Sequence, residues 1–375
     1  MKNSKDLDKN HDFQNIKKGM DYDMKIEKKL YGLTNDGKEA YLYTVTNDKG
    51  MEVSFTNYGA CIVSIIVPDS KGNKADVVLG YDNLEGYQED QAGFGAFIGR
   101  YANRISEGKF VINGKTYELE KNDGNNTLHG GSKGYNKCLY ETEIFQDEDM
   151  ISVEFSRLSP HMEQGFPGNL DISVTYSLSE ANELMIEYLV VSDQDTIINL
   201  TNHSYFNLAG HNSGSALDHK LWIKANQYNP TNNELIPTGE LKDVTGTPMD
   251  FRKSKSIGQD IDLDYEPLRI ARGYDHNYVL DLSGDDVEKV AQLVHEDSGR
   301  VMEVFTDMPG MQLYSSNMLE SVKNSKDGAS YNRGQGICFE TQFFPNSCNT
   351  PEFPSSMIRA GEEFESVTIY KFSAK

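Results

Sequence analysis

Alternating apolar and polar positions, interrupted by turn residues, run through most of the chain. The pattern is clearest around the turn pair Asn113-Gly114, where Phe110 and Ile112 precede the turn and Tyr117 and Leu119 follow it. Both turn residues tolerate a positive φ, which is typical of a two-residue hairpin loop. This segment is therefore predicted to be a β-hairpin.

The same reasoning predicts most of the chain to be strand. Three further strand pairs are expected, at 41–46 with 51–55, 171–179 with 184–192, and 290–296 with 300–306. Helical patterns are short and are confined to 83–90 and 255–261, while the polar stretch 321–332 is interpreted as an exposed loop. Successive strands joined by Gly, Asn and Asp turns predict an all-β protein, either a sandwich or a barrel.

The first 20 residues differ from the rest of the chain. They are rich in Lys, Asp and Asn and have no apolar core segment, so they do not resemble a secretory signal. We expect residues 1–20 to form a flexible, solvated extension. Residues 21–375 contain no repeat of fixed period and no Pro- or Ser-rich linker, so we expect them to form one domain.

Composition narrows the possible partners. The formal net charge of −22 repels phosphate, which argues against nucleic-acid and anionic-membrane binding. No apolar run reaches the ~18 residues that a membrane-spanning helix needs. The four cysteines form no C-x-x-C pair, which fits reduced thiols and a cytoplasmic protein.

Residues capable of chemistry gather in five segments that lie beside glycine turns. These are 99–104, 128–131, 201–210, 273–277 and 339–342. Strand ends and loops are where a sandwich carries function. The segment around His203 is the strongest, because Asn202, Ser204, Tyr205 and Asn207 supply more polar groups than a core strand tolerates. A single buried histidine satisfied by its neighbours is the alternative.

Three other candidates each have a structural alternative. Glu340 follows Ile, Cys and Phe, so it is either a partly buried base or, taken alone, a surface position of an alternating strand. Asp275 stands near Gly273, where turn chemistry would also explain it. Arg104 ends a glycine-rich turn and could orient the hydroxyl groups of a ligand or an anionic intermediate, or it could form a structural ion pair.

The sequence predicts neither a metal nor a cofactor. His203, His211 and His219 are eight residues apart, which is not a ligand spacing, and no Cys/His cluster exists. No phosphate-binding loop, dinucleotide fingerprint or nucleophile elbow is present.

Taken together, these segments resemble the aldose 1-epimerase (galactose mutarotase) family. The similarity covers about residues 30–372, in the family's order, through the segments 57–60, 99–105, 128–131, 202–210, 273–277, 310–314 and 340–342. The run Asn-His-Ser-Tyr-Phe-Asn-Leu at 202–208 is the most specific of them. Differences from the usual pattern occur at Ser316, where Gly is common, and at Asn346 and Cys348, where many members have Asp and Pro.

The resemblance implies a single large β-sandwich, the galactose mutarotase-like supersandwich, that interconverts the α and β anomers of a free aldohexose such as glucose or galactose. It implies that His203 is the general acid on the ring oxygen and Glu340 the general base on the anomeric hydroxyl. Sugar-binding roles fall to five further residues: Asn103, Arg104, His129, Asp275 and Gln312. The protein is expected to be a monomer or weak homodimer.

This chemistry sets requirements for the pKa values of His203 and Glu340. The acid should be protonated near neutral pH, and we expect an anion such as Asp275 to help keep His203 charged. Desolvation beside Phe339 and Cys338 should raise the pKa of Glu340, opposed by Arg104.

Other functions remain open at this point. A hexose-6-phosphate 1-epimerase would need clustered cations, and only Arg100 and Arg104 are available. A non-catalytic sugar-binding module would not need both His203 and Glu340. A glycosidase would use Glu340 with Asp275 at a separation that the sequence does not give.

Overall fold

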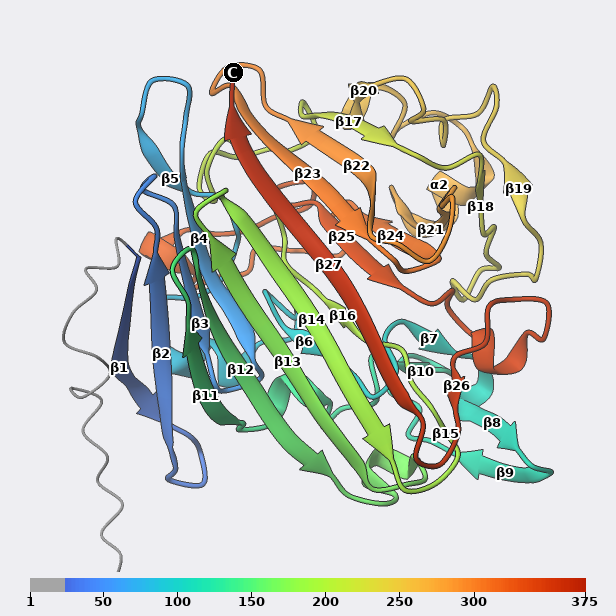
Figure 1. The fold of residues 1–375 in the computed structure, drawn as a ribbon. Coiled ribbons are helices and arrows are strands. Elements are labelled where there is room, and N and C mark those ends of the chain that lie inside the picture. The colour runs from blue at the N-terminus through green and yellow to red at the C-terminus, as the bar shows by residue number, and fades with distance from the viewer. Residues whose placement is uncertain (1–23) are drawn as a thin grey trace, which may run out of the picture.

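The computed structural model describes residues 24–375. The extension predicted at 1–20 lies outside the described residues. Regular structure in the described part is almost entirely β, and the strands form stacked layers (Figure 1). None of its helices has the length and apolar character needed to cross a membrane. The all-β prediction is confirmed.

Nine antiparallel strands form the largest sheet, in the order β11-β12-β13-β14-β27-β23-β22-β17-β20. Their bounds in that order are Glu141–Gln146, Met150–Ser159, Leu170–Ser179, Glu183–Ser192, Glu363–Ala374, Arg300–Thr306, Glu288–Val294, Lys220–Ile223 and Lys255–Ser256. The C-terminal strand β27 pairs with both β14 and β23, so it joins the two halves of the sheet (Figure 1).

Two five-stranded sheets accompany it. The first contains β1 to β5 in sequence order, with bounds Lys25–Leu33, Glu39–Thr46, Glu52–Thr56, Cys61–Pro68 and Lys74–Asp76. The second has the order β19-β18-β21-β24-β25, with bounds Lys242–Asp243, Gln227–Tyr228, Asp275–Val279, Gly310–Tyr314 and Cys338–Gln342.

Short ladders and helices complete the fold. The two-stranded ladders pair β6 (Phe97–Ile98) with β16 (Thr201–Asn202), β7 (Arg104–Ile105) with β10 (Thr127–Leu128), β8 (Lys109–Ile112) with β9 (Lys115–Glu118), and β15 (Thr196–Ile197) with β26 (Met357–Ile358). The α-helices are α1 (Leu84–Glu89) and α2 (Glu266–Ala271). Single 3₁₀ turns lie at Ser106–Gly108, Tyr135–Lys137, Glu163–Gly165, Ile257–Gln259, Lys326–Gly328 and Ser347–Asn349.

All four predicted hairpins are present, as the pairs β2–β3, β8–β9, β13–β14 and β22–β23. The helix predicted at 83–90 is α1, which the Asn83 side chain caps by accepting from the Gly86 N–H. The pattern at 255–261 instead forms strand β20 and one 3₁₀ turn. Helix α2 was not predicted. It is as short as α1, but the residue at its N-cap is Tyr265, which makes no side-chain capping bond, so the sequence carries no start signal like Asn83.

The stretch 321–332 is not simply an exposed loop, as the sequence suggested. Val322 and Tyr331 bridge to each other, and Tyr331 is buried. The Lys326 ammonium is also buried, and it donates to the Asp76 carboxylate and the Val78 carbonyl. This polar sequence is therefore anchored on the first five-stranded sheet, because its charged groups find partners inside the fold.

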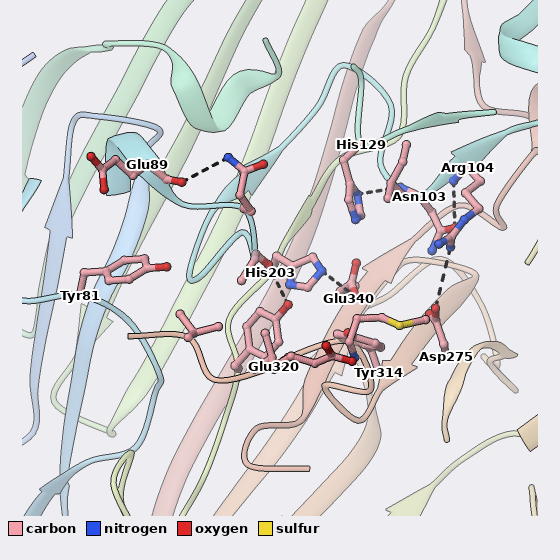
Figure 2. A pocket seen from close by; sticks show the side chains of 17 residues that line it. Tyr81, Glu89, Asn103, Arg104, His129, His203, Asp275, Tyr314, Glu320 and Glu340 are labelled. Carbon is pink, nitrogen blue, oxygen red and sulfur yellow. Dashed lines mark hydrogen bonds and ion pairs between the residues drawn. The ribbon is translucent and has the colours of Figure 1, made fainter. Parts of the chain in front are cut away.

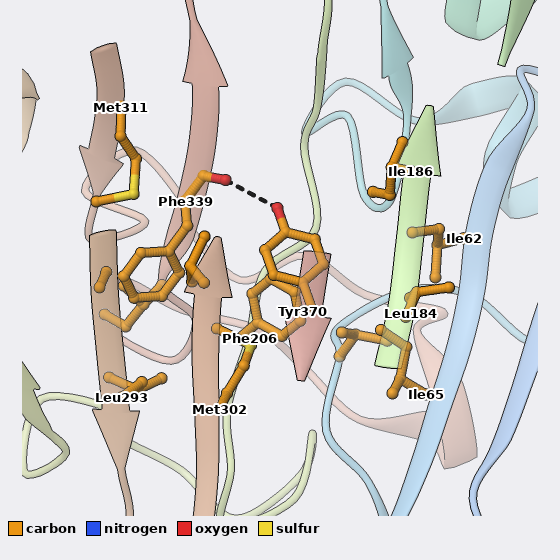
Figure 3. Close-up of a cluster of buried hydrophobic side chains, with 14 of the residues drawn as sticks. Ile62, Ile65, Leu184, Ile186, Phe206, Leu293, Met302, Met311, Phe339 and Tyr370 are labelled. Atoms are coloured by element: carbon orange, nitrogen blue, oxygen red, sulfur yellow. Dashed lines mark hydrogen bonds between the residues drawn. The ribbon is translucent and has the colours of Figure 1, made fainter. Parts of the chain in front are cut away.

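The main hydrophobic core lies between the large sheet and the two smaller ones. Phe55 of β3 stacks on Tyr176 of β13, with ring centroids 4.9 Å apart. Figure 3 shows a part of this core that reaches from Ile62 and Ile65 of β4 to Phe339 of β25, whose carbonyl accepts from the Tyr370 hydroxyl. Thr341 of β25 likewise contacts Thr368 of β27. Since successive strand residues face opposite sides, Glu340 must point away from the large sheet.

Candidate active site

A cavity of 460 Å³ opens beside strands β24 and β25 (Figure 2). Its lining comes from segments that lie far apart in the sequence, and each of the five segments named above contributes to it. The lining residues are Tyr81, Glu89, Gln91, Ala92, Asn103, Arg104, Leu128, His129, His203, Tyr205, Asp275, Tyr314, Met318, Leu319, Glu320, Val322 and Glu340.

Strand register places the acidic residues of the site. Glu340 of β25 lies opposite Gln312 of β24, and Asp275 of β21 lies opposite Tyr314, which also belongs to β24. The Glu340 residue is only 2% exposed, and its Oε2 has no hydrogen-bond partner within the described structure. The surface interpretation of Glu340 is therefore wrong, because strand β25 is covered on both faces.

Main-chain hydrogen bonds fix His203 immediately after strand β16. Its N–H donates to the Ala96 carbonyl and its carbonyl accepts from the Gly95 N–H. The neighbouring Asn202 side chain donates to the Gly95 carbonyl and accepts from the Ser204 hydroxyl and N–H. The side chains of Asn202 and Ser204 thus hold the backbone in place, while the rings of His203 (Figure 2) and Tyr205 line the cavity.

The catalytic candidates are in contact. The His203 Nε2 and Glu340 Oε1 atoms are 3.5 Å apart, and the two residues come from positions 137 apart in the chain. The His129 ring lies edge-on to the His203 ring, with centroids 5.3 Å apart. Two imidazoles and one carboxyl group therefore share one end of the cavity.

Asn103 and His129 hold each other through two hydrogen bonds. The His129 N–H donates to the Asn103 carbonyl, and the Asn103 N–H donates to His129 Nδ1 at 3.1 Å. Both residues have φ near +50 to +60°, a conformation that Asn tolerates but that is strained for His129. The ladder of β7 and β10, which pairs Arg104 with Leu128, holds Asn103 and His129 opposite each other.

Arg104 is the cation of the cavity. Its Nε donates to Asp123 at 2.7 Å, and its Nη1 lies 3.9 Å from the Asp275 carboxylate. The Gln312 amide donates to Asp275 at 2.6 Å. Gln312 does not line the cavity, so it lies behind Asp275 in this structure. Its predicted contact with the sugar stays a prediction.

Burial shifts the pKa of Glu340 and of Asp275 upward. Desolvation raises the pKa of Glu340 well above its ordinary value, the Asp275 charge adds to the rise, and Arg104 opposes it. Desolvation also raises the pKa of Asp275, against Arg104 and the Gln312 hydrogen bond. The expected direction for Glu340 is confirmed.

The expectation for His203 is wrong. Burial lowers the pKa of His203 to about 4, and Asp275 does not offset this effect. The nearest carboxyl group is that of Glu340. Because its own pKa is raised, this group tends to hold a proton and therefore does little to stabilise a positive charge on the His203 ring. At neutral pH the free site therefore favours a neutral imidazole next to a carboxyl group that tends to keep its proton.

The structure brings together three groups that could bind a metal, although the sequence spacing gave no such sign. Ligand atoms of His129, His203 and Glu340 all lie within 4.8 Å of one another. However, His129 Nδ1 already accepts from a main-chain N–H, so the neutral ring carries its proton on Nε2, which is the nitrogen left for the cavity. A metal-bound histidine normally has the opposite arrangement, with its second nitrogen donating.

We therefore expect activity to be independent of added or bound metal. Prolonged dialysis against EDTA should leave the rate of sugar mutarotation unchanged, as followed by polarimetry. A loss of rate that one particular metal restores would contradict this prediction.

Several lining residues were not predicted. Tyr314 is the last residue of the recognised segment 310–314. It lies two positions after Gln312 on the same strand, so the alternation of side chains could have placed both on the same face. Tyr81 and Glu89 precede and end helix α1, and Glu320 follows β24. These three carry no local sign of function, because only the tertiary fold brings their segments to the cavity.

Two of the three departures from the usual family pattern, Ser316 and Asn346, have structural roles. Ser316 adopts φ +51°, where Gly is favoured, and its hydroxyl accepts from the N–H groups of Gly334 and Gly336. Asn346 donates its N–H to the Arg104 carbonyl and accepts from the Ser106 N–H. Asn346 therefore braces the strand that carries Arg104.

The fold, and the cavity in which His203 and Glu340 meet, define a β-sandwich of the mutarotase class. Residues 41–371 match the family model for aldose 1-epimerase. The chain is 42% identical to the galactose mutarotase of Bos taurus over 86% of this chain and 91% of the relative, and 37% identical to the aldose 1-epimerase of Escherichia coli strain K12 over 92% and 98%. The crystal structure of galactose 1-epimerase from Lactobacillus acidophilus NCFM superposes with a TM-score of 0.83 at 27% identity, covering 94% of this chain and 99% of the other.

The chain belongs to the aldose 1-epimerase family. It is an isomerase that interconverts the anomers of sugars.

Proposed function

We propose that the protein interconverts the α and β anomers of free aldohexoses such as galactose and glucose, with Glu340 as general base and His203 as general acid. The observation that carries the proposal is the 3.5 Å contact between His203 Nε2 and Glu340 Oε1 inside a cavity lined by polar groups. Ring opening needs one group to remove the proton of the anomeric hydroxyl and another to protonate the ring oxygen. After rotation about C1–C2, the same two groups reverse their roles and close the ring on the other face.

The pair works with one exchangeable proton. In the reactive form, His203 holds that proton and Glu340 is ionised. After ring opening, Glu340 holds the proton taken from the anomeric hydroxyl and His203 is neutral. The lowered pKa of His203 and the raised pKa of Glu340 favour the form with neutral His203 and protonated Glu340 in the free site. These shifts therefore stabilise the protonation state that binds the open aldehyde. Because the two groups interact, their titration belongs to the pair.

This proton count also favours a bell-shaped pH profile. A second proton blocks the base, and burial moves that step below the ordinary histidine range, toward pH 4. Loss of the single proton removes the acid, and the raised pKa of Glu340 moves this step to higher pH. We expect activity to extend across the range between the two steps.

The remaining polar residues would hold the sugar. Neutral His129 offers an Nε2–H donor, and Asn103 and Arg104 lie beside it. Asp275 is an acceptor for hydroxyl groups and is itself positioned by Arg104 and Gln312. Hydrogen bonds of this kind orient a neutral ligand and supply the geometry that proton transfer requires.

The charges of the cavity favour a free sugar over a sugar phosphate. The Arg100 guanidinium is buried elsewhere, where it donates to the carbonyls of Pro167, Gly168 and Ser159. Arg104 is already paired with two carboxylates. The other charged groups of the lining are acidic, so a phosphate would meet repulsion with no unpaired cation to bind it.

Polarimetry tests the proposed function directly. Freshly dissolved α-D-galactose and α-D-glucose should reach their equilibrium rotation faster with the protein than without it. The corresponding hexose 6-phosphates should show little acceleration. A strong preference for the phosphates would overturn the substrate assignment, and release of reducing sugar from a glycoside would indicate hydrolysis by Glu340 and Asp275.

The proposed function extends to the domain organisation, location and oligomeric state of the protein. We propose that residues 21–375 act as one catalytic domain, because β27 joins early and late strands of one sheet. No disulfide joins the four cysteines, all of which lie in the described part, and this supports a cytoplasmic, reducing location. We expect a monomer or weak homodimer.

A further inference from the structure

The Cys338 thiol contacts the nitrogen of His203 that faces away from Glu340. Its Sγ atom lies 3.6 Å from His203 Nδ1, within the range of a hydrogen bond to sulfur. Both residues are buried, and Cys338 stands on the same face of β25 as Glu340, two positions earlier. The other acceptor beside the ring is the main-chain carbonyl of His203 itself, whose hydrogen bond raises the pKa of the ring; among residues 24–375 no other side chain bonds to Nδ1.

The proposed reaction determines which nitrogen must carry the permanent proton. His203 Nε2 exchanges a proton with the sugar, so it must be able to lose that proton and take it back. A neutral imidazole that has lost the Nε2 proton carries its remaining proton on Nδ1. This Nδ1–H then needs an acceptor in a buried site, because an unpaired buried donor is costly.

We propose, on the basis of the function proposed above, that Cys338 is a positioning residue whose sulfur accepts the Nδ1–H of His203. This hydrogen bond selects the tautomer that leaves Nε2 free toward Glu340 and the sugar, and it fixes the direction of the ring. The thiol itself does not touch the reacting atoms.

The choice of sulfur has a chemical consequence. A carboxylate in this position would stabilise the imidazolium and weaken it as an acid. A thiol is a weak, uncharged acceptor, because burial keeps the pKa of Cys338 well above its ordinary value. The sulfur therefore orients the ring without reducing its ability to protonate the poorly basic ring oxygen.

The other groups around the ring come from four segments. Those that titrate or carry charge are Glu340 of β25, Tyr314 of β24, Tyr205 next to β16, and His129 after β10. Burial raises the pKa of both tyrosines above their ordinary range, so neither is charged at neutral pH. Glu340 is thus the only group of this set that can compete with Cys338 for a proton of the ring.

The test begins with the wild-type protein, selectively labelled with ¹⁵N-histidine. Long-range ¹H–¹⁵N correlation spectra above the pKa of His203 should show the proton on Nδ1, with the His203 signals assigned by their absence from His203→Asn. A proton on Nε2 would overturn the proposal. This spectrum does not depend on turnover, so it separates failure of the proposal from failure of the proposed function.

Two substitutions test the contribution to the reaction. Cys338→Ala removes the acceptor and should lower kcat by about tenfold with little change in KM, as expected for one lost hydrogen bond. Cys338→Ser keeps an acceptor, so it should restore most of the rate. Since a hydroxyl is the stronger acceptor, Cys338→Ser should also raise the pKa of His203 and move the acid limb of the pH profile to higher pH.

The matched control is Cys61→Ala. Cys61 is also a buried thiol on a strand, and it makes no hydrogen bond to His203 in the described structure. Its removal should leave kcat, the pH profile and the His203 signals unchanged. Cys338→Ala with an unchanged kcat and an unchanged acid limb would contradict the proposed role.

Discussion

Replacing Glu340 by Gln should lower kcat for sugar mutarotation by roughly 10²–10⁴, the usual effect of losing one proton transfer. Gln has nearly the same volume but cannot accept the proton of the anomeric hydroxyl at neutral pH. Sugar binding should be largely retained, because the other groups around the cavity are unchanged. The measurements are the initial rate of optical-rotation change, corrected for spontaneous mutarotation, and calorimetric binding of the sugar.

The free energy of unfolding of Glu340→Gln shows whether a lost rate is caused by unfolding. Because burial raises the pKa of Glu340, the folded state retains a proton that the unfolded state releases once the pH exceeds the ordinary Glu pKa. The carboxyl group therefore lowers the free energy of unfolding as the pH rises above that value. Glu340→Gln removes this effect and should be at least as stable as the wild type at pH 8, so a lost rate would not reflect unfolding.

Asp275→Asn is the matched catalytic control. Asp275 lies in the same cavity and its pKa is also raised, yet its proposed role is to position the sugar. Its replacement should raise KM more than it lowers kcat. If Glu340→Gln instead reacts at nearly the wild-type rate, the base lies elsewhere and Asp275 becomes the first candidate.

The strands were predictable because alternation and turn chemistry are local. Asn113-Gly114 determines its hairpin within a few residues, and the pairing of β8 with β9 follows directly. The stacking of sheets was not predictable in this way. The burial of Glu340 depends on β25 having Phe339 and Thr341 against the large sheet while loops cover its other face.

The site was predictable as a set of residues but not as an electrostatic arrangement. Motif resemblance selected His203 and Glu340, and the structure places them in contact. The sequence could not show that the nearest carboxyl to the His203 ring is Glu340, since the two lie far apart along the chain. The incorrect expectation of a charged His203 followed from assigning that position to Asp275.

Substituting His203 by Asn should also lower kcat by roughly 10²–10⁴, because Asn can donate a hydrogen bond to the ring oxygen but cannot deliver a proton to it. The double variant with Glu340→Gln should be little slower than either single variant. Ring opening uses both groups in one event, and their side chains are in contact. Once one group is replaced, the other can no longer contribute to proton transfer, so the second substitution should add little further loss. Rates from polarimetry on all four proteins complete this cycle. Losses that multiply would show that His203 and Glu340 act in independent steps, and the shared proton proposed for the pair would then be wrong.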